Sequence, residues 1–236
     1  MKTQGLDIVY FVKAFPSSDL RYSIRSAAKN FDFKFLYIYG GKRADIKPDV
    51  YYEFINQEGA TKWDKVRNMY KRVCLNDNIS EDFIMFHDDF FIMQPTNKLE
   101  YEYRFSLDEH IKRLREKYAN NLNEYSKLLI NAKKLLEREN KTTYSYELHK
   151  PFIFNRKKLL NILELFPRAH CIRTIYANYY ELGGGQTHDV KLYGGEPAFD
   201  YKKEPMLSTN NIVSAGDNEY WNYIKSQFKE KCRFEA

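Results

Sequence analysis

The chain has 236 residues, of which 43% are hydrophobic, 30% are charged and 17% are aromatic. This size predicts a single domain, residues 1–236, with a sizeable core and room for one insertion. Lysine and arginine outnumber aspartate and glutamate to give a net charge of +6, but no block of like charge indicates a nucleic-acid-binding tail.

The cysteines and the apolar segments exclude two further classes. Cys74, Cys171 and Cys232 are isolated and show no C-x-x-C spacing, which argues against a disulfide framework or a zinc site. The first residues lack the apolar run of a signal peptide, and no stretch reaches the roughly 18 apolar residues of a membrane span. We therefore expect a cytoplasmic protein without stable membrane insertion.

The first part of the chain predicts alternating strands and helices. Apolar runs at residues 8–12, 35–39, 83–86 and 90–93 are typical of buried strands, and residues 50–55 predict a weaker one. Helical spacing extends from Leu20 to Asn30 and from Trp63 to Val73. The order β, α, β, β, α, β predicts an α/β fold with a mostly parallel central sheet flanked by helices. Ligands of such sheets gather at the carboxyl ends of the strands.

Residues 106–140 predict a helical insertion within this domain. Apolar residues recur every three or four positions from Leu107 to Leu136, which indicates one long amphipathic helix or two helices broken near Asn120-Asn121. We interpret the insertion as a lid, an acceptor platform or an oligomer contact, and a helix simply packed on the sheet is an equal alternative. Beyond it we expect a strand at 152–154, helices at 156–166, 172–180 and 217–228, and a flexible loop at 183–185.

Asp88 and Asp89 give the strongest chemical signal, because they directly follow a buried apolar run. Unpaired carboxylates are costly to bury, so the pair must be solvated, salt-bridged or bound to a cation. Mg²⁺ or Mn²⁺ prefers carboxylate oxygens and neutralises the charge that grows on a departing diphosphate. Consecutive strand residues point to opposite faces, so both side chains reach one ion only if the strand has ended. The alternative is a turn with two exposed aspartates.

Weaker candidates for binding a nucleotide cofactor lie elsewhere in the first seventy residues. Asp7, at the start of the first strand, is placed to hydrogen-bond a base or a ribose. Arg21 and Arg25 lie four apart on one helix face and would clamp phosphate with forked hydrogen bonds. Lys62 and Asn68 lie in or beside the loop after the third strand. The alternative for each is a strand cap or a solvated surface residue.

Two histidine-containing segments are candidates for proton transfer. If the chain is extended there, Glu147 and His149 share a face, and the imidazole would complete a metal shell or move a proton. His188-Asp189 follows three glycines and forms a polar pair able to close over a ligand. The alternative is that these histidines are structural.

Several strings carry a resemblance to known proteins. In order and spacing they resemble the Stealth proteins, which are sugar-phosphate transferases of capsule synthesis. They also resemble short phage and bacterial glycosyltransferases, which match better in length. The strings are DIVY at 7–10, DLRYSIRS at 19–26, FIMFHDDFF at 83–91 and HKP at 149–151. The short proteins also share KWD at 62–64, YELH at 146–149, RT at 173–174, DVK at 189–191 and CRFE at 232–235.

The resemblance covers most of the chain except the helical middle, and it implies a GT-A-like (Rossmann-like) fold. It implies a nucleotide-sugar donor, a divalent metal at the Asp88-Asp89 pair and a place for His149 in the active site. From the residues we expect Mn²⁺ or Mg²⁺ held by Asp88, Asp89 and His149, and a UDP-sugar is our first choice of donor. Arg21 and Arg25 would serve the donor. The residues that we assign to catalysis are His149, Asp89, Glu147 and Asp189, and those that we assign to the donor are Asp7, Arg21, Arg25, Lys62, Asn68 and Asp88.

The sequence departs from the Stealth pattern at two places. Stealth proteins carry a longer first motif that ends in a Gly-Ser-Asp-like turn, whereas the first strand here runs into Lys13-Ala14-Phe15. They also carry an asparagine where His87 precedes the acidic pair. We therefore expect plain glycosyl transfer rather than transfer of a sugar phosphate.

The sequence does not identify the acceptor of the sugar. A hydroxymethylated DNA base, a glycan, a protein or a small metabolite fits the resemblance, which also suggests a bacterial or phage-infected cytosol. The insertion offers a surface for an oligomer. Two alternatives remain for the function: a Stealth-type sugar-phosphate transferase, and a non-catalytic module of the same fold that binds nucleic acid or protein.

Overall fold

The computed structural model describes residues 1–13, 15, 17–52, 61–118 and 121–236. Its central sheet has five strands in the order β3–β2–β1–β4–β7. The first four are mutually parallel and β7 is antiparallel to β4, so the predicted α/β class with a mostly parallel sheet is confirmed. The strands are β1 (Asp7–Phe11), β2 (Leu36–Tyr39), β3 (Val50–Tyr52), β4 (Asp82–His87) and β7 (Phe152–Asn155).

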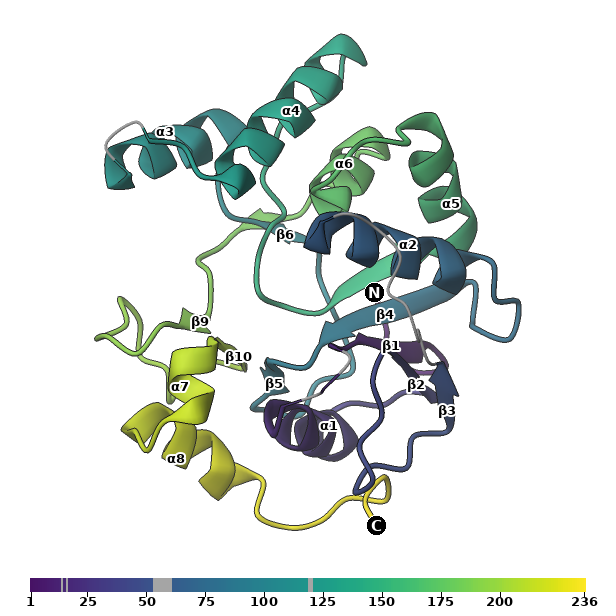
Figure 1. Cartoon of the computed structure of the whole chain (residues 1–236), viewed down its shortest axis with the longest axis vertical. Helices are drawn as coiled ribbons and strands as arrows, with labels where there is room; N and C mark the ends of the chain where they lie inside the picture. The colour runs from purple at the N-terminus through teal and green to yellow at the C-terminus, as the bar shows by residue number, and fades with distance from the viewer. Residues whose placement is uncertain (14, 16, 53–60, 119–120) are drawn as a thin grey trace.

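Helices cover both faces of this sheet (Figure 1). On one face lies α1 (Asp19–Asn30), and on the other lie α2 (Lys62–Cys74), α5 (Arg156–Leu165) and α6 (Ile172–Tyr179). Alternate strand residues enter the two cores: Ile8 packs on the α1 side and Val9 on the opposite side. This two-sided burial explains why the strands read as continuous apolar runs.

The insertion consists of two helices, α3 (Leu107–Lys117) and α4 (Glu124–Arg138), so the two-helix alternative is correct. A side-chain oxygen caps each helix at its first turn, from Ser106 for α3 and from Asn123 for α4. The apolar face of α4 enters the same core as the central sheet and α6. Figure 1 shows the pair projecting beyond the sheet on the side of α6.

A second sheet continues from the end of β4. Its strands are β5 (Phe90–Ile92), β10 (Met206–Thr209) and β9 (Lys191–Leu192), in the order β5–β10–β9. Strand β10 runs antiparallel to β5 and parallel to β9. The helices α7 (Asn211–Ala215) and α8 (Glu219–Gln227) complete this part of the molecule, and Trp221 of α8 packs against Phe91.

The structure corrects the prediction at several points. The flexible loop expected at 183–185 is shorter than predicted, because Gly185 belongs to a short strand, β8 (Gly185–Gln186). This strand pairs with β6 (Glu102–Tyr103). Gly184 has a φ of +110° and lies against the backbone of Tyr101, so a side chain has no room there. Strands β6, β8, β9 and β10 and helix α7 were not predicted. Residues 53–55 of the expected third strand, Ala14 and Asn120 lie outside the described residues.

The remaining predicted elements are found close to their expected positions. Among the described helices, none combines the length and the apolar character that a bilayer crossing requires.

Candidate functional site

The carboxyl end of β4 is where several distant segments meet. Because β7 is antiparallel to β4 with Met85 opposite Phe152, the residues that precede β7 lie beside those that follow Met85. This register brings His149 into electrostatic contact with His87. On the other side, His87 pairs with Phe11 at the end of β1. The site therefore lies at the sheet edge where ligands of parallel sheets gather.

Asp88 and Asp89 form the turn between β4 and β5. The strand has ended at His87, so the alternation of a strand does not force the two side chains apart. The carboxylate of Asp89 accepts hydrogen bonds from Lys191 Nζ at 3.0 Å and Ser208 Oγ at 3.2 Å. Within the described part of the chain, the Asp88 side chain has neither an ion pair nor a hydrogen bond to another residue. One carboxylate is thus engaged and the other is available.

The two carboxyl groups differ in protonation as well. Burial and the neighbouring charge of Asp89 raise the pKa of Asp88 to about 7. Burial acts on Asp89 in the same sense, but Lys191 and His87 outweigh it and lower the pKa of Asp89 below its usual value. Burial lowers the pKa of the His87 imidazole to about 4. Without a ligand, the carboxyl group of Asp88 is therefore only partly ionised near neutral pH.

Asp19 is a third acid at this edge and was not among the predicted site residues. It is the first residue of α1 and only 3% exposed. Burial raises its pKa, and the charge of Asp89 acts in the same direction. Its Oδ1 atom has no hydrogen-bond partner among the described residues. Asp19 thus offers a second acidic oxygen at this edge that no described residue binds.

His149 and Asp189 form a tightly held pair. The Nδ1 atom of His149 lies 2.8 Å from Oδ2 of Asp189, and the backbone N–H of His149 donates to Oδ1 at 3.1 Å. Burial would raise the pKa of Asp189, but the contacts with His149 and the nearby Arg104 lower it to about 2. The Asp189 side chain is 5% exposed while that of His149 is 35% exposed, so the imidazole is the accessible partner.

A cavity of about 680 Å³ opens beside this pair. It is lined by four of the predicted site residues: Lys62, Glu147, His149 and Asp189. Asp88 and Asp89 do not line it, but the residues that flank or contact them do, among them His87, Phe90 and Lys191. The acidic turn thus lies behind the wall of the cavity.

Glu147 and Lys62 both line the cavity. The Glu147 carboxylate accepts a hydrogen bond from the backbone N–H of Thr174 at 3.3 Å, in the first turn of α6. A carboxylate at the N-terminus of a helix interacts favourably with the helix dipole. Lys62, the first residue of α2, has its Nζ atom 4.5 Å from the centre of the Trp63 ring.

The structure places Asp7 and Asn68 away from the cavity. Asp7 opens β1 at the opposite edge of the sheet, and its carboxylate accepts hydrogen bonds from the backbone N–H groups of Phe35 at 3.1 Å and Ser80 at 2.7 Å. It ties the starts of neighbouring strands together. Asn68 lies on α2 and is not among the described residues that line the cavity. We therefore leave both out of the site.

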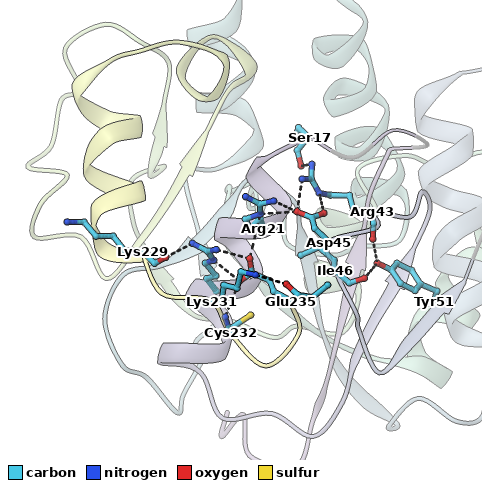
Figure 2. A network of polar contacts seen from close by, with 12 residues as sticks. Ser17, Arg21, Arg43, Asp45, Ile46, Tyr51, Lys229, Lys231, Cys232 and Glu235 are labelled. Carbon is cyan, nitrogen blue, oxygen red and sulfur yellow. Dashed lines mark hydrogen bonds and ion pairs between the residues drawn. The ribbon is translucent and has the colours of Figure 1, made fainter.

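Arg21 and Arg25 hold the C-terminal segment instead of a ligand. Arg21 pairs with Asp45, which also binds Arg43 at 2.8 Å (Figure 2). Arg25 makes two bonds to Glu235, at 2.6 and 2.7 Å, in a buried pair. The i to i+4 spacing that resembled a phosphate clamp is thus used to fasten α1 to the end of the chain. We exclude both arginines from the site.

The acidic edge is compatible with an open cation site. Among the described residues, no three histidine, cysteine or acidic side chains converge tightly enough to enclose a metal ion. Mg²⁺ and Mn²⁺ sites of nucleotide-using proteins need only one or two carboxylates, because phosphate oxygens and water complete the shell. Asp88 and the Oδ1 atom of Asp19, neither of which binds another residue in the described part of the chain, fit that donor set.

Several residues of the site were not predicted. Lys191 and Ser208 bind Asp89 across 102 and 119 positions, and they reach it through the unpredicted strands β9 and β10. Lys13 follows the end of β1, and its positive charge favours the ionised form of Asp88. Arg104 lies 3.6 Å from Asp189. No local signal marks these residues, since a single lysine, serine or arginine between elements is common.

No family model and no curated protein sequence matches this chain. Among solved structures, the glycosyltransferase GlyE of Streptococcus pneumoniae TIGR4 aligns with a TM-score of 0.32 and 8% identity, over 55% of this chain and 43% of that chain. Its apo form aligns with a TM-score of 0.31 and 10% identity, over 60% and 44%. The chain thus spans less than half of these structures. A likeness this weak assigns neither a family nor an activity, and the resemblance to Stealth and phage proteins stays a prediction.

Proposed function

We propose that this protein is a glycosyltransferase that moves a sugar from a nucleotide-sugar donor to a hydroxyl acceptor with the help of Mn²⁺ or Mg²⁺. The observation that carries the proposal is the meeting of the Asp88-Asp89 turn and the oriented His149 at one edge of a mostly parallel sheet. The adjoining cavity of about 680 Å³ has the size of a small-molecule site.

The acidic turn would serve the donor. A divalent cation bound there would neutralise the charge that develops on the leaving diphosphate. Asp88 is the carboxylate free to contact it, and a cation would favour the charged form of this group. Lys191 holds Asp89 in place, and Lys13 adds positive charge on the side of β1.

His149 would serve the acceptor as general base. In this role Nδ1–H of His149 donates its hydrogen bond to the carboxylate of Asp189, which leaves Nε2 of this cavity-lining residue as the nitrogen that can accept a proton. Nε2 takes the proton of the acceptor hydroxyl while the oxygen attacks the anomeric carbon. The bond from that carbon to the diphosphate breaks, and its electron pair leaves with the diphosphate. Asp189 stabilises the imidazolium that forms.

A screen of nucleotide sugars with Mn²⁺ tests the proposal, beginning with uridine-linked donors. We expect release of UDP by the wild-type protein and a fall to background in His149→Ala. Release of a nucleoside monophosphate would instead indicate sugar-phosphate transfer. If no nucleotide sugar is bound or consumed with either metal, the proposal is wrong and a binding module on this fold becomes the better hypothesis.

A further inference from the structure

Two guanidinium groups, those of Arg104 and Arg113, lie close to the ring of Phe105 in the lining of the cavity. The Cζ atom of Arg104 is 5.5 Å from the ring centre, and that of Arg113 is 4.0 Å away. These three residues also line a second cavity of about 860 Å³, formed with residues 186–199. Because this stack lines both cavities, as Asp189, Lys191 and Tyr193 also do, it lies where the two cavities adjoin.

Positive charge exceeds negative charge in the first cavity. Its described lining contains six cationic side chains and two carboxylates, those of Glu147 and Asp189. Both carboxylates are already bound, by the backbone of Thr174 and by His149. The cationic residues are Lys62, Arg104, Arg113, Lys117, Arg173 and Lys191. A concave wall with this excess concentrates anions.

The two arginines of the stack retain free hydrogen-bonding capacity. The guanidinium of Arg104 makes no hydrogen bond to any residue that the structure describes, and its nearest carboxylate, on Asp189, is 3.6 Å away. Arg113 donates from Nε to Glu109 at 2.7 Å, and no described residue accepts a hydrogen bond from its two terminal nitrogens. Each guanidinium lies within cation–π distance of the Phe105 ring, which favours this placement of the two forks. Such forks match the oxygens of a phosphate group.

We propose that the acceptor carries a phosphate group, which Arg104 and Arg113 bind while a hydroxyl of the same molecule faces His149. This inference rests on the proposed function. The stack belongs to the acceptor side because Arg104 approaches Asp189, the partner of His149, whereas Lys13 and Lys191 act on the acidic turn. The second cavity, which this stack also lines, contains neither His149 nor His87 among its described residues.

A matched pair of ligands isolates the phosphate. Glucose 6-phosphate and glucose are titrated into the full chain by calorimetry, with UDP and Mn²⁺ present at saturation. We expect glucose 6-phosphate to bind at least about 10-fold more tightly than glucose. Arg113→Gln should remove most of this difference, and Arg104→Lys should keep the charge but weaken binding because the fork is lost. Arg115→Gln, an exposed change on the same helix outside the cavity, should leave the difference intact.

Three results would overturn the inference. The first is equal affinity for the two sugars while UDP and Mn²⁺ are bound, which would leave the proposed function untouched. The second is loss of glucose 6-phosphate binding when UDP and Mn²⁺ are added, which would place the phosphate in the donor site. The third is an equal loss in Arg113→Gln and Arg115→Gln. Failure of UDP to bind with Mn²⁺ would overturn the proposed function itself, and the acceptor role with it.

Discussion

His149 and Asp189, forty positions apart, are joined by hydrogen bonds both from the ring and from the backbone of the histidine. The same carboxylate therefore fixes where the His149 backbone lies and which way its imidazole faces. Since Asp189 is almost fully buried and His149 is partly exposed, the imidazole is the accessible member of the pair. This arrangement is the basis of the first prediction.

Asp189→Asn should lower the rate of sugar transfer by about 10²- to 10⁴-fold, because an amide neither fixes the tautomer of His149 nor stabilises its charged form. The measurement is UDP release at saturating donor. Glu204→Gln is the matched control, since it removes a carboxylate from the His188–Glu204 pair, 3.0 Å apart, outside the first cavity. Undiminished transfer by Asp189→Asn would show that His149 does not act as the base.

Arg25→Gln should destabilise the fold by about 3–5 kcal/mol, because the Glu235 carboxylate, 3% exposed, loses the guanidinium that binds both of its oxygens. Arg25 also donates to the carbonyls of Phe228 and Lys229, so the C-terminal segment loses its attachment to α1. Urea unfolding measures the effect. In the control, Lys98→Gln breaks the exposed Lys98–Glu100 pair and should cost at most about 1 kcal/mol. Similar small losses in both variants would contradict the role given to Arg25.

The stability of the fold should fall between about pH 6.5 and pH 4 in part because of His110. Burial lowers the pKa of this histidine to about 4, so over that range the unfolded chain binds a proton that the folded chain does not. His110 contributes no loss above pH 6.5, where it is neutral in both states. On acidification below pH 6.5, the free energy of unfolding falls progressively because of His110. This loss reaches its full size, at most about 3 kcal/mol, near pH 4 and does not grow at lower pH.

The variant His110→Asn isolates this contribution. Asparagine can keep the hydrogen bond to Ser145, which lies 2.8 Å from Nδ1 of His110, and it does not titrate. The free energies of unfolding of the wild type and the variant, measured from pH 7 to pH 4, should approach each other as the pH falls. A difference that stays constant with pH would contradict the buried, neutral state of His110.

Local patterns were sufficient to predict the elements of the central sheet. The apolar run around Ile8 and Val9 predicted β1 because both faces of that strand are buried. The helical spacing after Leu20 predicted α1 to its last residue, Asn30. Such patterns reflect burial of neighbouring residues, and the position of the acidic turn at the sheet edge followed from the order of the elements.

Partners distant in the chain were not predictable in this way. The spacing of Arg21 and Arg25 indicated a clamp, but spacing does not reveal that Glu235, 210 positions beyond Arg25, would take the guanidinium. In the same way, the lysine that holds Asp89 comes from β9, a two-residue strand too short to show a period. The ionic partner of a charged side chain depends on tertiary structure. These partners determined which of the predicted residues we kept in the site.

Titration of UDP into the protein with and without Mn²⁺, repeated on Asp88→Asn and Asp89→Asn, tests the central claim that the acidic turn binds a diphosphate through a divalent cation. We expect metal-dependent binding in the wild type and its loss in Asp88→Asn, because no residue that the structure describes binds the Asp88 carboxylate. Asp89→Asn should be less severe if Lys191 keeps part of the turn in place. Metal-independent binding, or full affinity in Asp88→Asn, would contradict the account.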